Sequence, residues 1–82
     1  MKLTIYSKPD CPYCTKIKQV AEYLVKEKQY SVVNYELNID FTKEQFYREF
    51  GEGSTFPQVI LNEHYLGGCT DAVRYLQENK LL

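Results

Sequence analysis

The first third of the chain changes from a two-residue to a helical period of apolar positions. Leu3 and Ile5 alternate with polar neighbours, which predicts a strand over residues 2–6. After a turn at residues 7–10, apolar side chains recur three and four positions apart and form one face of a helix that runs to about Lys28. The members of that face are Ile17, Val20, Ala21, Leu24 and Val25.

The middle of the chain predicts a second strand and a short second helix. Residues 30–38 are rich in β-branched and aromatic side chains, as expected of a strand. Thr42 followed three positions later by Gln45 matches a capping box, which marks the start of a helix. Phe46 and Phe50 then lie one turn apart, on the side of this helix that we expect to be buried.

The last third predicts two more strands and a final helix. Residues 58–61 form the third strand, residues 62–64 turn the chain, and Tyr65 begins a fourth strand that ends at Gly67. The final helix is capped by Thr70 or Cys69. Its apolar stripe consists of Ala72, Val73 and Leu76.

The resulting order is β-α-β-α-β-β-α. The first two strands, with a helix between them, form a right-handed parallel crossover, whereas the last two form an antiparallel hairpin. We therefore expect an α/β fold, a four-stranded mixed sheet flanked by three helices, in a single domain over residues 1–82.

Charge, apolar runs and cysteine count reduce the number of function classes that this sequence allows. The net charge is −1 with no block of like charge, so neither nucleic acid nor an anionic membrane surface is indicated as a partner. No leader pattern precedes the first strand, and no apolar run could cross a membrane. Three cysteines are too few for a secreted scaffold held by disulfides. These features favour the reducing cytoplasm, where a CxxC pair is catalytic or metal-binding.

Cys11-Pro12-Tyr13-Cys14 carries the chemistry. Pro12 suits the first position of a helix, which makes Cys11 its N-cap. The Cys11 sulfur then faces free backbone N–H groups and the positive end of the helix dipole, and both favour a thiolate. Cys14 lies one turn further in and should be less exposed than Cys11. Such a pair is a dithiol redox centre.

Other interpretations of the cysteines remain open at this point. Cys11, Cys14, Cys69 and His64 could in principle form a Cys₃His zinc set, although Pro12 argues against it. Cys11 could also be a plain structural thiol. Cys69 is either a small residue beside a binding site or an auxiliary thiol.

Three motifs in this order resemble the glutaredoxins of the thioredoxin-like fold. They are Cys11-Pro12-Tyr13-Cys14, Thr55-Phe56-Pro57 and Gly67-Gly68-Cys69-Thr70-Asp71. The resemblance covers the whole chain and is greatest to the small dithiol glutaredoxins of bacteria and phages. One departure is Phe56, where the family more often has valine. The resemblance implies a glutathione-disulfide oxidoreductase, with Cys11 as nucleophile and Cys14 as resolving thiol.

The same resemblance implies a glutathione site and a set of partners. Glutathione would be a co-substrate, with no tightly bound cofactor and no metal. The clients would be glutathionylated or disulfide-containing proteins, with ribonucleotide reductase named by analogy only, and the protein would be a monomer. A protein reduced instead by thioredoxin reductase is the alternative, as is an iron–sulfur glutaredoxin, against which Pro12 argues. The residues implied in glutathione binding are Lys8, Tyr13, Thr55, Phe56, Pro57, Gly68, Cys69, Thr70 and Asp71.

Individual members of this set also have plainer interpretations. The resemblance implies a cis peptide bond before Pro57, but that residue could simply be a proline at the start of a strand. Thr70 and Asp71 would hold the γ-glutamyl end of glutathione, or they could be an N-cap and a first-turn acid. Lys8 would lie near the glycyl carboxylate.

Overall fold

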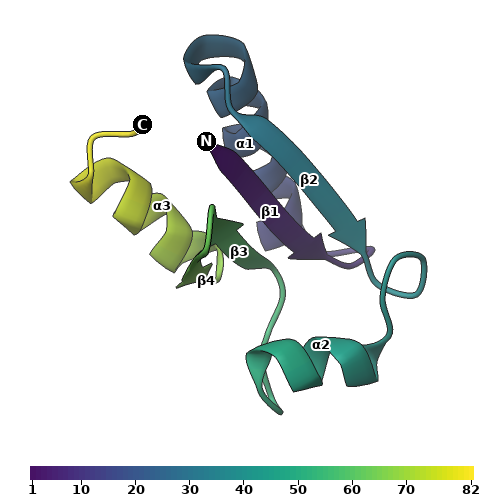
Figure 1. The fold of residues 1–82 in the computed structure, drawn as a ribbon. Coiled ribbons are helices and arrows are strands. Elements are labelled where there is room, and N and C mark those ends of the chain that lie inside the picture. Colours follow the sequence, from purple (N-terminus) through teal and green to yellow (C-terminus); the bar gives the residue numbers. More distant parts are fainter.

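The fold has the seven predicted elements in the predicted order. The computed structural model describes residues 1–82, and Figure 1 shows the arrangement. The elements are β1 (Lys2–Ser7), α1 (Pro12–Lys28), β2 (Ser31–Glu36), α2 (Lys43–Phe50), β3 (Gln58–Leu61), β4 (His64–Gly67) and α3 (Cys69–Glu78). No helix is both long and apolar enough to span a membrane.

The four strands form one mixed sheet in the order β2-β1-β3-β4. β1 pairs in parallel with β2 and antiparallel with β3, and β3 pairs antiparallel with β4. The expected crossover and hairpin are therefore both present. Because β1 is central, the loop that follows it leads directly into α1 and brings the cysteine pair to one end of the sheet.

One face of the sheet is covered by α1 and α3, which also pack against each other (Figure 1). Leu3 and Ile5 on β1 are fully buried beneath these helices, as the alternation of apolar positions predicts. The helices contribute Ile17, Leu24 and Leu76 to this core, each with 0% exposure. This core fixes the helix that carries the cysteines.

The opposite face carries a second packing unit, the aromatic cluster. Tyr6 on β1 points away from Leu3 and Ile5, and its ring contacts the ring of Phe50 on α2. The members of the cluster are Tyr6, Tyr35, Phe41, Phe46, Phe50, Phe56 and Tyr65. Contacts between these rings attach α2 to the sheet, and the capping box predicted at its start, Thr42 with Gln45, is confirmed.

Two details of the predicted helices are wrong. Val25 is 46% exposed, because it lies at the edge of the apolar face whose centre is occupied by Ile17 and Leu24. α3 is not capped by the side chain of Thr70 or Cys69. Its N-cap is Gly68, whose extended backbone starts the helix one residue earlier and without a side-chain hydrogen bond.

Candidate active site

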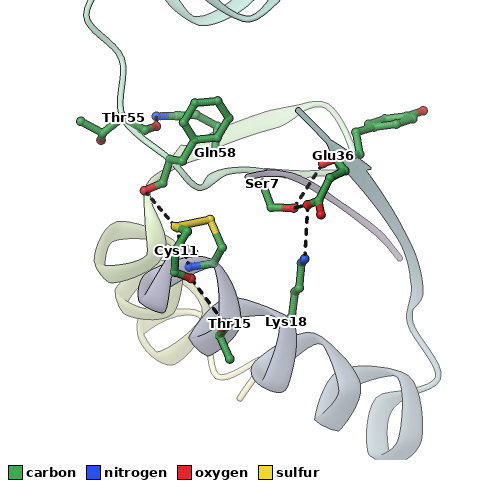
Figure 2. The surroundings of a disulfide bond; sticks show 10 residues. Ser7, Cys11, Thr15, Lys18, Glu36, Thr55 and Gln58 are labelled. Atoms are coloured by element: carbon green, nitrogen blue, oxygen red, sulfur yellow. Dashed lines mark hydrogen bonds and ion pairs between the residues drawn. A yellow bond between two sulfur atoms is a disulfide. The ribbon is translucent and has the colours of Figure 1, made fainter. Parts of the chain in front are cut away.

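Cys11 and Cys14 form a disulfide at the start of α1 (Figure 2). Cys11 is the N-cap, as predicted, with an extended backbone and Pro12 in the first turn. The backbone N–H of Cys14 donates to Cys11 Sγ at 3.2 Å. Negative charge that develops on this sulfur would be stabilised by that donor and by the helix dipole.

The burial of the two cysteines differs less than the sequence suggests. Cys14 is 2% exposed, in agreement with its expected position inside the first turn, but Cys11 is only 9% exposed. The predicted order of exposure is confirmed, but Cys11 is also buried in this oxidised form. The reason is the neighbouring segment, since the carbonyl oxygen of Phe56 lies 4.0 Å from Cys11 Sγ.

The segment before β3 provides backbone groups beside Cys11. The Phe56–Pro57 peptide bond is cis, as the resemblance implies. The backbone N–H of Phe56 makes no hydrogen bond within the chain, so it is available to a ligand. The side-chain amide of Gln58 donates to the carbonyl oxygen of Thr55 at 2.9 Å and ties this segment to the start of β3 (Figure 2).

A hollow of about 170 Å³ adjoins this segment. Three parts of the chain line it: the first turn of α1, the segment before β3 and the start of α3. Its lining residues are Tyr13, Thr55, Phe56, Pro57, Gly68, Cys69, Thr70 and Asp71. The structure thus brings together eight of the nine residues that the resemblance implies for glutathione.

Lys8 is the ninth residue, and it lies apart from that hollow. Its Nζ is 5.6 Å from the centre of the Phe56 ring, in a cation–π contact. It lines a neighbouring hollow of about 490 Å³ together with Cys11, Cys14 and Lys18. Phe56 is therefore the implied glutathione residue that Lys8 contacts.

Gly67 and Asp71 lie in close contact at the start of α3. Gly67 has a φ of +94°, a backbone conformation that residues other than glycine rarely adopt. A Cβ on residue 67 would lie 3.2 Å from Asp71 Oδ2, closer than most Cβ contacts, so the carboxylate would have to move slightly to admit a side chain there. The other carboxylate oxygen accepts a hydrogen bond from Arg74 at 3.3 Å.

Sequence reasoning missed a polar network at the end of β1. The buried hydroxyl of Ser7 donates to Glu36 Oε1 at 2.9 Å, and Lys18 Nζ lies 3.7 Å from the same oxygen. Figure 2 shows Lys18 reaching from α1 toward Glu36, to one side of the disulfide. The parallel register pairs Ser7 with Glu36, so only knowledge of that register could have identified the network.

Cys69 is buried, and its thiol is weakly nucleophilic. It is 8% exposed, and burial raises the pKa of its thiol, while the nearby Lys16 charge acts in the opposite direction. Protonated thiols are poor nucleophiles, which favours the plain packing role over the auxiliary thiol. No group of three or more cysteine, histidine or acidic residues is arranged to hold a metal ion.

Comparisons with known proteins agree with this arrangement. The glutaredoxin family model matches residues 3–66. A glutaredoxin of Vibrio cholerae is 33% identical over 82 residues, covering 96% of this chain and 94% of that protein. The solved structure of reduced Escherichia coli glutaredoxin superposes with a TM-score of 0.82 at 26% identity, over 100% of both chains.

A more distant solved structure has the same fold. A buckwheat glutaredoxin in complex with glutathione matches with a TM-score of 0.74 at 23% identity, over 96% of this chain and 71% of that one. The family match, the similar fold and the Cys11–Cys14 disulfide all indicate thiol–disulfide exchange as the chemistry. The chain belongs to the glutaredoxin family.

Proposed function

We propose that this protein is a glutathione-dependent thiol–disulfide oxidoreductase that reduces protein disulfides and glutathione mixed disulfides. The observation that carries the proposal is the meeting of two features near Cys11. Its sulfur lies at the N-terminus of α1, and a hollow lined by three separate segments begins next to it, beyond the Phe56 carbonyl.

Cys11 is the attacking thiol. As a thiolate it attacks one sulfur of a substrate disulfide and forms a mixed disulfide with it, while the other sulfur leaves as a thiolate and takes up a proton. The N–H of Cys14, 3.2 Å from Cys11 Sγ, supports the charged form before attack. The Phe56 carbonyl can accept a hydrogen bond only from the protonated thiol, so it opposes ionisation.

Cys14 resolves mixed disulfides with proteins. Its thiolate attacks the Cys11 sulfur, releases the reduced protein and leaves the Cys11–Cys14 disulfide described above. Two glutathione molecules then supply two electrons and leave as glutathione disulfide. When Cys11 carries glutathione itself, a second glutathione completes the cycle without Cys14.

Glutathione occupies the hollow beside Phe56. Its backbone pairs with the free N–H of Phe56 as a short added strand. The γ-glutamyl end lies at the start of α3, where Asp71 accepts from its ammonium group and Thr70 donates to its carboxylate. Lys8, in cation–π contact with the Phe56 ring, attracts the glycyl carboxylate. The known buckwheat complex supports the proposal, because that protein of the same fold binds glutathione.

Family membership supports a proposal for the physiological setting. We assign the protein to the cytoplasm as a monomer with no tightly bound cofactor, acting on glutathionylated or disulfide-containing proteins. Ribonucleotide reductase is a candidate client by analogy with similar small glutaredoxins. Thr70 and Asp71, which line the hollow at the start of α3, count against the alternative reductant, thioredoxin reductase.

The decisive measurement compares three proteins on two substrates, with glutathione as the sole reductant. Cys11→Ser should abolish turnover of both a glutathionylated peptide and a protein disulfide. Cys14→Ser should retain turnover of the glutathionylated peptide and lose reduction of the protein disulfide. Equal loss of both activities in Cys14→Ser would refute this division of roles. Turnover with thioredoxin reductase but not with glutathione would refute the proposed reductant.

A further inference from the structure

A groove between α1 and α3 lies outside the chemistry described so far. Its volume is about 780 Å³, several times that of the hollow beside Phe56. Its walls are mainly apolar and aromatic. Tyr13 and Tyr23 come from α1 and are 56% and 44% exposed, Val73 comes from α3, and Leu82 closes one side. The groove thus keeps apolar side chains in contact with water.

The groove is continuous with the proposed glutathione site. Tyr13, Cys69 and Thr70 line both the groove and the hollow beside Phe56. A ligand bonded to Cys11 can therefore pass from one into the other. Glutathione is too short to do both, because its γ-glutamyl end lies at Asp71 and its glycyl end near Lys8 in the proposed pose, and no residue follows either end. A polypeptide bonded through a cysteine continues on both sides of that residue.

The charges in the groove favour an acidic ligand. Lys16 and Arg74 are the charged side chains that line it, and no aspartate or glutamate side chain does. Lys16 Nζ lies 5.7 Å from the centre of the Tyr13 ring, and Arg74 is held by Asp71. Both cations therefore lie near the end that adjoins the redox site, whereas Tyr23 and Leu82 extend the apolar wall.

We propose that this groove is the docking surface for the segment of a client protein that flanks the cysteine bonded to Cys11. The segment binds in an extended form, with a carboxylate close to its cysteine facing Lys16 and Arg74, and with apolar side chains beyond it against Tyr23 and Val73. The inference rests on the proposed function, since it requires a mixed disulfide at Cys11. Such a docking surface would contact protein clients but not small glutathione disulfides.

The test measures thiol–disulfide exchange at equilibrium in the Cys14→Ser protein, where a mixed disulfide at Cys11 cannot be resolved internally. The protein joined to glutathione is mixed with a peptide that contains one cysteine, and the peptide-bound and glutathione-bound forms are counted by mass spectrometry. Three peptides are compared. One has glutamate near the cysteine and leucines beyond it on both sides, one has lysine in place of glutamate, and one has only glycine and serine.

The acidic, apolar peptide should displace glutathione about tenfold more effectively than the glycine and serine peptide. The lysine peptide should fall between them, and the advantage of glutamate over lysine should shrink at high salt. Lys16→Glu should reverse the preference for glutamate, and Tyr23→Ser should reduce the advantage of leucine. Matched controls on α1 are Lys26→Glu and Val25→Ser, which make similar changes at exposed positions outside the groove.

Three failures are distinguishable. If the Cys14→Ser protein forms mixed disulfides with glutathione and with all three peptides equally, the groove is not a docking surface, while the proposed chemistry stands. If the peptide preference survives both Lys16→Glu and Tyr23→Ser, the docking surface lies elsewhere. If no mixed disulfide with glutathione forms at Cys11, the proposed function itself fails, and the docking proposal fails with it.

Discussion

The ring of Phe56 lies face to face with the ring of Phe46, with centroids 4.0 Å apart and ring planes within 10°. Phe46 is on α2 and is 1% exposed, whereas Phe56 belongs to the segment that borders Cys11. α2 thus supports the redox site from behind, although it contributes no residue to the hollow.

This contact predicts energetic coupling between the two rings. Stacked aromatic pairs contribute about 0.5–1.5 kcal/mol beyond the area that they bury. In a double-mutant cycle with Phe46→Leu and Phe56→Leu, the unfolding free energies should therefore deviate from additivity by about that amount. Chemical denaturation of the four proteins measures it. Additive effects would mean that the rings pack without any specific interaction.

Asp71 should matter for glutathione substrates and little for stability. Its carboxylate is exposed, and the pair with Arg74 is of the surface type, worth about 0–1 kcal/mol. A charge-assisted hydrogen bond to the substrate ammonium contributes about 1.5–3 kcal/mol, so Asp71→Asn should lower kcat/KM for a glutathionylated peptide by about tenfold or more. The control is Arg74→Gln, which removes the partner and keeps the carboxylate. An equal loss in both variants would contradict a direct role for Asp71.

Tyr30 offers a prediction about stability alone. Its hydroxyl is buried in the main core with no hydrogen-bond partner, and burial raises the pKa of that phenol. An unsatisfied buried polar group costs about 1–3 kcal/mol, so Tyr30→Phe should raise the unfolding free energy by about 1 kcal/mol or more. Tyr23→Phe, at an exposed position, should change it little. A loss of stability in Tyr30→Phe would show that the hydroxyl has a partner.

The raised pKa of the Cys69 thiol predicts that the stability of the folded protein depends on pH. Because burial raises its pKa in the folded state, the folded protein retains a proton that the unfolded chain loses as pH rises. Its contribution to stability is complete below the ordinary thiol pKa and is lost as pH rises through the folded-state pKa. The stability of the wild type should therefore fall relative to Cys69→Ala in that alkaline range, as measured by urea denaturation at several pH values. A constant difference across the range would contradict the shift.

The same shift governs labelling of Cys69. With Cys11 and Cys14 oxidised, iodoacetamide should react with Cys69 slowly at neutral pH and faster at alkaline pH. Denatured protein provides the control for the unhindered rate. Fast labelling of the folded protein at neutral pH would restore the interpretation of Cys69 as an auxiliary thiol.

The parts of the site that depend on local sequence could be predicted. Pro12 in the first turn makes Cys11 the N-cap, and the alternation in β1 and the capping box at Thr42 each depend on a few adjacent residues. The lining of the hollow was predicted through the family resemblance rather than from the residues themselves, because three distant segments form it.

The parts that depend on docking and register could not be predicted. The stacking of Phe56 on Phe46 requires the position of α2 against the sheet, which no local pattern specifies. The Ser7 and Glu36 contact requires the register of β1 with β2. The low exposure of Cys11 depends on the Phe56 carbonyl, which belongs to a segment 45 residues away.

The close contact between Gly67 and Asp71 has a consequence for how such sequences diverge. Because a Cβ at residue 67 would lie 3.2 Å from Asp71 Oδ2, a substitution of this glycine also acts on Asp71, whereas Asp71 can change without affecting Gly67. A side chain gained at 67 would have to adopt an unfavourable backbone conformation and would also displace the acid. Lineages that keep Asp71 should therefore also keep glycine at residue 67, whereas the glycine can be kept after the acid is lost.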